Sequence, residues 1–86
     1  MKFEVLVEVK LRPGIADPAG ATIERSLPAL GFEGIRGVRV GKAIRFELEA
    51  PDEAGARAHA DEVCQRFLIN PVIEAADLTL SVVEAV

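Results

Sequence analysis

Hydrophobic and polar residues alternate along three stretches of the chain, and each alternation is typical of a β-strand with one buried face. Apolar residues occupy every second position from 3 to 11, and the same rhythm returns over 44–48 and over 78–82. Arg12-Pro13-Gly14 ends the first stretch with residues that interrupt a strand and favour a turn. The pattern therefore predicts three strands at these positions.

A fourth strand is predicted just before the second alternation. Val38 and Val40 flank Arg39 in the same two-residue rhythm, and Gly41-Lys42 separates them from the strand that follows. Gly at the first central position suits a tight hairpin turn, because that position requires a positive φ. We therefore expect a β-hairpin over residues 38–50, with Gly41 as its turn residue.

Two helices are predicted between the strands. Asp17-Pro18 is a helix-start signal, apolar residues follow at 23, 27 and 30, and Gly31 ends the helix. Pro28 lies inside this pattern and is expected to bend its last turn. The second helix begins after Pro51 and ends before Asn70-Pro71. Its expected apolar stripe consists of Ala56, Ala60, Val63 and Phe67, widened by Cys64 and Leu68.

The element order is β-α-β-β-α-β, within an expected single domain over residues 1–86. Short connections and right-handed crossovers make this order typical of a ferredoxin-like sandwich. We therefore expect an α+β fold, with one four-stranded antiparallel sheet and two helices on one face. The other face would carry Glu4, Leu6, Glu8, Arg45, Glu47, Thr79, Ser81 and Val83. Leu6 on this polar face is either an isolated exposed side chain or a contact with another chain.

Composition narrows the possible partners. The net charge is −4 without any basic run, so binding to a nucleic-acid backbone is not expected. There is no apolar tract long enough for a membrane span, and the alternating N-terminus does not resemble a signal peptide. A single cysteine leaves no internal disulfide, which favours a cytoplasmic location. The mean hydropathy of +0.26 is high for 86 residues and indicates self-association.

The sequence offers little catalytic chemistry. His59 is the only histidine and lies toward the polar side of the second helix, whereas Cys64 lies on the apolar side as a core residue. Residues 37–42 lack the spacing and the Ser or Thr of a phosphate-binding loop. We therefore expect no catalytic, cofactor-binding or metal-binding residue. The candidates for a partner contact or a turn are Arg39, Gly41, Lys42, Arg45, Asn70 and Pro71.

Four segments together resemble the PurS family, the small subunit of phosphoribosylformylglycinamidine (FGAM) synthase. They are Asp17-Pro18-Ala19-Gly20, Leu30-Gly31-Phe32, Val38-Arg39-Val40-Gly41-Lys42, and the stretch from Cys64 to Glu74. The resemblance implies a non-catalytic subunit of a glutamine-dependent, ATP-consuming ligase in purine (IMP) biosynthesis. It also implies three partners: a second copy in a dimer or tetramer, the large synthetase subunit PurL, and the glutaminase subunit PurQ.

In such a complex the large subunit uses ATP and Mg, and the small subunit assembles the others and assists ammonia transfer. This chain itself would hold no cofactor. Two alternatives remain open at this point. An ACT-like regulatory module that senses a small molecule shares the sandwich architecture, because a fold alone does not fix a function. A free-standing enzyme is opposed by the missing nucleophile and base.

Overall fold

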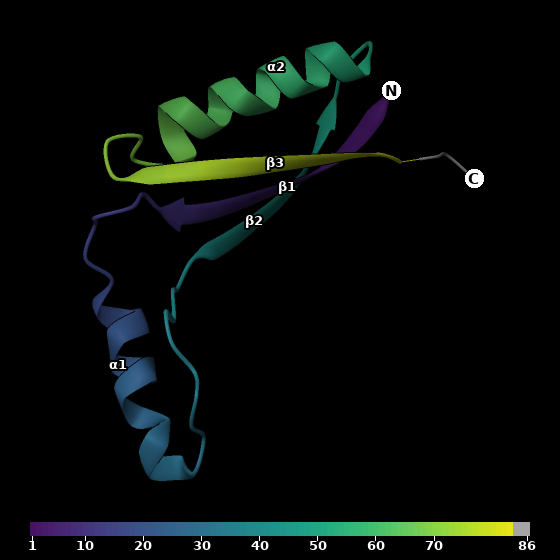
Figure 1. The fold of residues 1–86 in the computed structure, drawn as a ribbon. Helices are drawn as coiled ribbons and strands as arrows, with labels where there is room; N and C mark the ends of the chain where they lie inside the picture. Colours follow the sequence, from purple (N-terminus) through teal and green to yellow (C-terminus); the bar gives the residue numbers. More distant parts are fainter. Residues whose placement is uncertain (84–86) are drawn as a thin grey trace.

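The structure, a computed structural model, describes residues 1–83, which form a three-stranded antiparallel sheet and two α-helices (Figure 1). The strands are β1 (Lys2–Leu11), β2 (Lys42–Glu49) and β3 (Glu74–Val83), in the order β2-β1-β3. The helices are α1 (Pro18–Ser26) and α2 (Glu53–Val63), followed by the 3₁₀ turn η1 (Pro28–Leu30) and the π-helical turn η2 (Cys64–Leu68), respectively. The predicted α+β class is confirmed. The predicted domain ends at residue 86, and its last three residues lie outside the described residues.

The core lies between β1 and α2. The inward side chains of the central strand are almost completely buried, with Phe3, Val5 and Val7 at 0% exposure and Val9 at 3%. Val5, Val7 and Val9 form one cluster with Ala60 and Cys64. Ala56, Ala60 and Cys64 are all buried and recur every four positions along α2 and its end. Burial of each large apolar side chain contributes about 1.5–3 kcal/mol. Small residues on the helix allow this close approach to the sheet.

The two outer strands are only half covered on the same face. Ile44, Phe46 and Leu48 on β2 are partly exposed, as are Leu78 and Leu80 on β3. One helix is about 10–12 Å wide with its side chains, and neighbouring strands lie about 4.8 Å apart, so a single helix covers the middle of a three-stranded sheet and leaves its flanks open. The opposite face carries the predicted mixture, including Glu4, Leu6 and Arg45, with Leu6 half-buried between Arg45 and Thr79.

Residues 17–41, here called the arm, project away from the sheet (Figure 1). The arm consists of α1, η1 and a returning segment that runs alongside α1. The radius of gyration is 16.9 Å, whereas a compact chain of this length has about 12 Å. The expectation of two helices on one face of the sheet is therefore wrong within this chain: α2 covers the sheet, and α1 stands apart in the arm.

The predicted fourth strand and its hairpin are not formed. Residues 38–40 belong to no ladder of the described sheet, and β2 pairs only with β1. Gly41 is not at positive φ; the glycines with positive φ are Gly14, Gly31, Gly34 and Gly37. A Cβ at Gly41 would instead lie 2.5 Å from the carbonyl oxygen of Val9. Gly41 is thus required for the close approach of two backbones.

The helix ends largely follow the sequence signals. Asp17 caps α1 and Asp52 caps α2: their side chains accept hydrogen bonds from the backbone amides of Gly20 and Gly55, respectively. The α-helix of α1 ends at Ser26, two residues before Pro28, and Gly31 closes the following turn at a φ of 88°.

The predicted stripe on α2 is wrong at Phe67, whose side chain is 85% exposed. In η2 the amide of Ile69 donates to the carbonyl of Cys64, which is the five-residue spacing of a π-turn. This turn places one extra residue in the helix circumference and breaks the register of the stripe. Of the two residues expected in the apolar stripe, Cys64 is therefore buried and Phe67 is exposed.

Candidate functional site

The shape of the arm depends on the Asp17 carboxylate, whose side chain is only 8% exposed. One oxygen accepts the Gly20 amide at 2.9 Å as the helix cap, and the other accepts the Val40 amide at 2.8 Å. The Arg39 guanidinium lies 3.9 Å away. The hydrogen bonds from Gly20 and Val40, followed by the charge of Arg39, hold the pKa of Asp17 below its usual value. A single carboxylate thus joins the start of α1 to the returning segment.

A second carboxylate holds the same segment about two helical turns further on. Glu24 Oε1 accepts the Val38 amide at 2.8 Å. Between the two bonds, Gly20 lies against the segment so closely that a Cβ there would clash with the Val38 carbonyl oxygen. The returning segment therefore lies directly against α1, fixed by hydrogen bonds from its amides to side chains instead of by a β-ladder.

The arm exposes several large apolar side chains. Their exposed fractions are 46% for Ile23, 70% for Leu30, 55% for Phe32, 46% for Ile35 and 40% for Val40. Isolated exposed apolar residues are common, but this group is concentrated on one projecting element that has no core of its own. The arm therefore has the properties of a surface that another chain covers.

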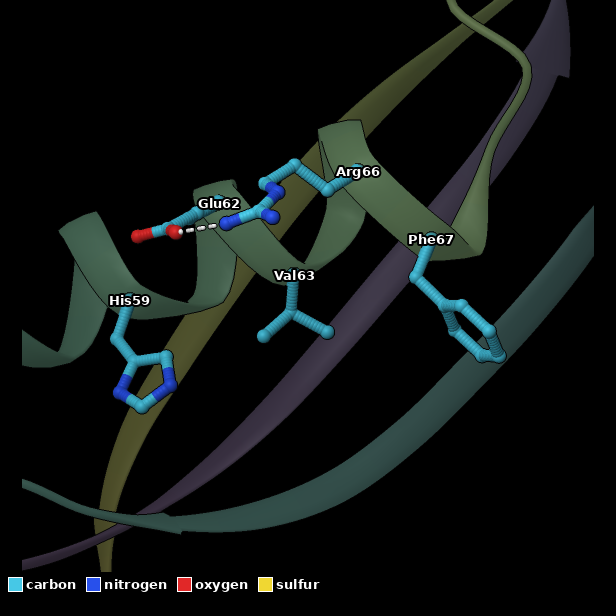
Figure 2. A pocket seen from close by; sticks show the side chains of 5 residues that line it. All are labelled: His59, Glu62, Val63, Arg66 and Phe67. Atoms are coloured by element: carbon cyan, nitrogen blue, oxygen red, sulfur yellow. Dashed lines mark hydrogen bonds and ion pairs between the residues drawn. The ribbon is translucent and has the colours of Figure 1, made fainter.

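A second apolar feature lies at the end of α2. His59, Val63 and Phe67 line an open hollow of about 370 Å³ with Glu62 and Arg66, which form an ion pair at 2.8 Å (Figure 2). Figure 2 shows His59, Val63 and Phe67 extending from the same flank of the helix. The opposite flank, with Arg57 and Asp61, faces β3 residues such as Asp77. The flank with Val63 and Phe67 is therefore on the β2 side.

Most of the predicted contact residues lie near one end of the sheet. Gly41 and Lys42 lie beside Val9 of β1. Arg39, another predicted contact residue, forms an ion pair with Asp17. Asn70 and Pro71 form the turn before β3, which is tied to the end of β1 because Arg12 Nε donates to the Pro71 carbonyl oxygen at 2.9 Å. Arg45 is separate from them, on the open face of the sheet opposite Leu6.

The sequence did not predict the roles that three arm residues have in the structure. Asp17 was interpreted only as a helix cap, and Glu24 and Phe32 were given no contact role. The spacing of Asp17 and Glu24, seven residues apart and hence on one face of a helix, is a signal that was present in the sequence. Its meaning depends on Val38 and Val40, which are distant in sequence.

The described residues contain little reactive chemistry. Cys64 is buried, and this burial, together with the charge of Asp61, raises the pKa of its thiol. His59 is exposed on α2. Within residues 1–83, no three side chains of His, Cys, Asp or Glu gather closely enough to hold a metal ion. In the same range, no helix is long and apolar enough to cross a membrane.

Comparison with known proteins identifies the family. Residues 4–82 match the family model described as PurS, phosphoribosylformylglycinamidine (FGAM) synthase. The chain belongs to the PurS family. The FGAM synthase subunit PurS from Synechocystis is 44% identical over 72 residues, which are 84% of this chain and 72% of that relative. The Methanocaldococcus jannaschii PurS subunit is 32% identical over 82 residues, or 95% of this chain and 99% of the relative.

Solved PurS structures share the fold. The M. jannaschii PurS crystal structure has a TM-score of 0.85 at 30% identity and covers 95% of this chain and 99% of its own. A Thermotoga maritima structure described as PurLQS has a TM-score of 0.86 at 31% identity, with 94% and 99% covered. Because these matches extend over nearly the whole chain, they favour the PurS interpretation over an ACT-like regulatory module.

Proposed function

We propose that this chain is the small, non-catalytic subunit of FGAM synthase in purine biosynthesis and that it assembles a PurL-type synthetase with a PurQ-type glutaminase. The observation that carries the proposal is the match to PurS within the T. maritima PurLQS structure, which covers 94% of this chain and 99% of that one. The protein of that structure combines the three subunits, and this chain has the length and fold of its PurS component.

The side chains of this chain support a role without chemistry of its own. The buried Cys64 has a raised thiol pKa, which disfavours the thiolate that a glutaminase nucleophile needs. Its surfaces are instead suited to contact, through the apolar arm and the Val63–Phe67 flank of α2. In this proposal ATP and Mg²⁺ are used by the large subunit, glutamine is cleaved by the glutaminase, and this chain holds the two together for ammonia transfer.

Self-association is part of the same proposal. An arm with five exposed apolar side chains is costly in water, and a second copy is the partner available to every chain. The four-stranded, ferredoxin-like arrangement, with a second helix beside the sheet, would then be reached in the assembled protein instead of within one chain. A cytoplasmic location also belongs to the proposal, in keeping with the single cysteine.

Reconstitution of the enzyme tests this function. The large subunit and the glutaminase from the same source are mixed with formylglycinamide ribonucleotide and ATP, with and without this chain. Glutamine-dependent FGAM synthesis is expected only when the chain is present, because the glutaminase must be docked to deliver its ammonia. Ammonium chloride at high concentration is expected to support synthesis in both mixtures, because free ammonia reaches the synthetase without a docked glutaminase.

Two outcomes would contradict the proposal in different ways. Equal glutamine-dependent rates with and without the chain would remove its assembly role. Loss of the ammonium-dependent rate when the chain is omitted would show that it contributes to the synthetase site itself.

A further inference from the structure

Residues 69–74, here called the β3 turn, join the end of η2 to the start of β3 (Figure 1). The turn is fixed at both ends and exposed at its tip. Ile69 is buried at 8% exposure, whereas Val72 at the tip is 79% exposed. At the far end, the backbone amide of Arg12 donates to the carbonyl oxygen of Ile73 at 2.8 Å. The turn thus holds an apolar side chain out from the end of the sheet.

Every backbone N–H group in residues 70–74 has an acceptor within the chain. The amide of Asn70 donates to Glu74 Oε1 at 2.7 Å, and the amide of Val72 donates to Asn70 Oδ1 at 3.2 Å. The amides of Ile73 and Glu74 both donate to the Asn70 carbonyl oxygen, at 3.1 and 2.8 Å. Water satisfies the amides of an exposed turn, whereas a turn covered by a partner needs acceptors of its own. A partner can therefore cover the β3 turn without leaving any of these amides unpaired.

The neighbouring turn at the same end of the sheet differs. In residues 13–16, the amide of Ile15 donates to the Arg12 carbonyl oxygen at 3.2 Å. The amides of Gly14 and Ala16 have no acceptor in the part of the chain that the structure describes. A position at this end of the sheet does not by itself produce a turn without free amides. The bonds within the β3 turn are therefore a property of its own residues.

A guanidinium group is held beside the tip of the β3 turn. Arg12 Nε donates at 2.9 Å to the carbonyl oxygen of Pro71, the residue before Val72. The terminal nitrogens of Arg12 take part in none of the hydrogen bonds or ion pairs within residues 1–83. A guanidinium oriented in this way presents N–H donors that suit a carboxylate. The turn thus combines an apolar tip with an oriented cation.

We propose that the β3 turn docks against a larger subunit of the complex, where Val72 enters an apolar pocket and Arg12 pairs with a carboxylate at its rim. This inference rests on the proposed function and names a contact through which the chain holds that subunit. The apolar hollow at the end of α2 in a second copy does not fit this description. Its carboxylate, Glu62, is already paired with Arg66 at 2.8 Å. The pocket is therefore assigned to a different protein.

Val72→Asp tests the apolar half of the contact. The chain is titrated into the large subunit and the glutaminase, and glutamine-dependent FGAM synthesis is followed. We expect the half-saturating concentration to rise about tenfold or more, with the rate at saturation unchanged, because docking is weakened and the chemistry is not. Val82→Asp is the matched control, because Val82 is also exposed, at 51%, but lies at the opposite end of β3. It should leave the half-saturating concentration unchanged.

Arg12→Gln tests the charged half. It should raise the half-saturating concentration about threefold or more at low salt, and its difference from the unchanged protein should shrink as salt screens the ion pair. A purely structural role in the turn would not produce this dependence on salt. Arg57→Gln is the control, because Arg57 is an exposed arginine of α2 whose ion pair with Glu53 is long, at 4.0 Å. If Val72→Asp fails to fold by circular dichroism, Arg12→Gln decides the question.

An unchanged half-saturating concentration for either folded variant would overturn the inference, and synthesis that still requires the chain would leave the proposed function standing. A Val72→Asp protein with half the mass of the unchanged protein in light scattering would also overturn it, because the turn would then belong to a contact between copies. Glutamine-dependent synthesis that does not require the chain would remove the inference and the proposed function together.

Discussion

Residues 1–11 and 42–83, here called the body, enclose a continuous apolar core, whereas the arm of residues 17–41 buries only Gly20. In the body, Phe3 and its neighbours on β1 are removed from water by α2. In the arm, carboxylates fix the backbone while Leu30 and Phe32 remain exposed. The difference shows that hydrophobic burial maintains the body, and that hydrogen bonds keep the arm in a shape whose apolar side chains stay exposed.

Two phenylalanines, one in each region, give the largest expected contrast. Phe3→Ala should lower the free energy of unfolding by about 3–5 kcal/mol, because a fully buried ring is lost from the core. Phe32→Ala should cost less than about 1 kcal/mol, because Phe32 is 55% exposed. Urea unfolding followed by circular dichroism measures both. The two variants and the unchanged protein are compared at one protein concentration. Equal losses would show that the arm has a core of its own.

The junction between the two regions gives an intermediate effect. Gly41→Val should lower the free energy of unfolding by about 1–3 kcal/mol, because its Cβ would meet the carbonyl oxygen of Val9 and a backbone atom cannot easily move aside. Ala43→Val, at an exposed position of β2, is the control and should change stability little. Thermal unfolding of both variants measures the difference. Identical melting temperatures for Gly41→Val and Ala43→Val would contradict the close contact.

The smallest expected effect concerns Asp17 and pH. Its pKa is lowered in the folded arm, so its contribution is fully present above the unfolded value near 3.8 and is lost as the pH falls through the lower folded pKa. The Val40 amide shift in NMR should therefore titrate with a midpoint below 3.8. Asp17→Asn should abolish this titration and accelerate hydrogen exchange at Val40. A midpoint at or above 3.8 would contradict the hydrogen bond from the Val40 amide to the Asp17 carboxylate.

Local pattern was sufficient to predict much of the body. The alternation in β1, β2 and β3 and the start of α2 after Pro51 are each determined by residues within a few positions of one another. The absence of a catalytic set of residues was also an expectation from composition, and the reconstitution experiment tests it.

The arm could not be predicted in the same way, because its structure depends on distant contacts. The Val38–Val40 alternation suggests a strand, but periodicity does not say whether a strand finds a partner in its own chain. Gly41 was assigned a turn because glycine permits positive φ. Its actual requirement, the nearness of Val9, depends on a residue more than thirty positions away. Phe67 was misplaced because one π-turn shifts the helical register.

Hydrogen exchange at two protein concentrations tests most directly the claim that the body folds alone and that a second copy completes the arm. The two concentrations are chosen on either side of the dimer dissociation constant. Mass spectrometry of peptides from 32–41, from β2 and from β1 separates the regions. We expect amides of the arm, including those in 37–41, to exchange more slowly at the higher concentration, whereas those of β1 are equally protected at both. Exchange in 37–41 that is independent of concentration, while the mass changes from monomer to dimer, would contradict it.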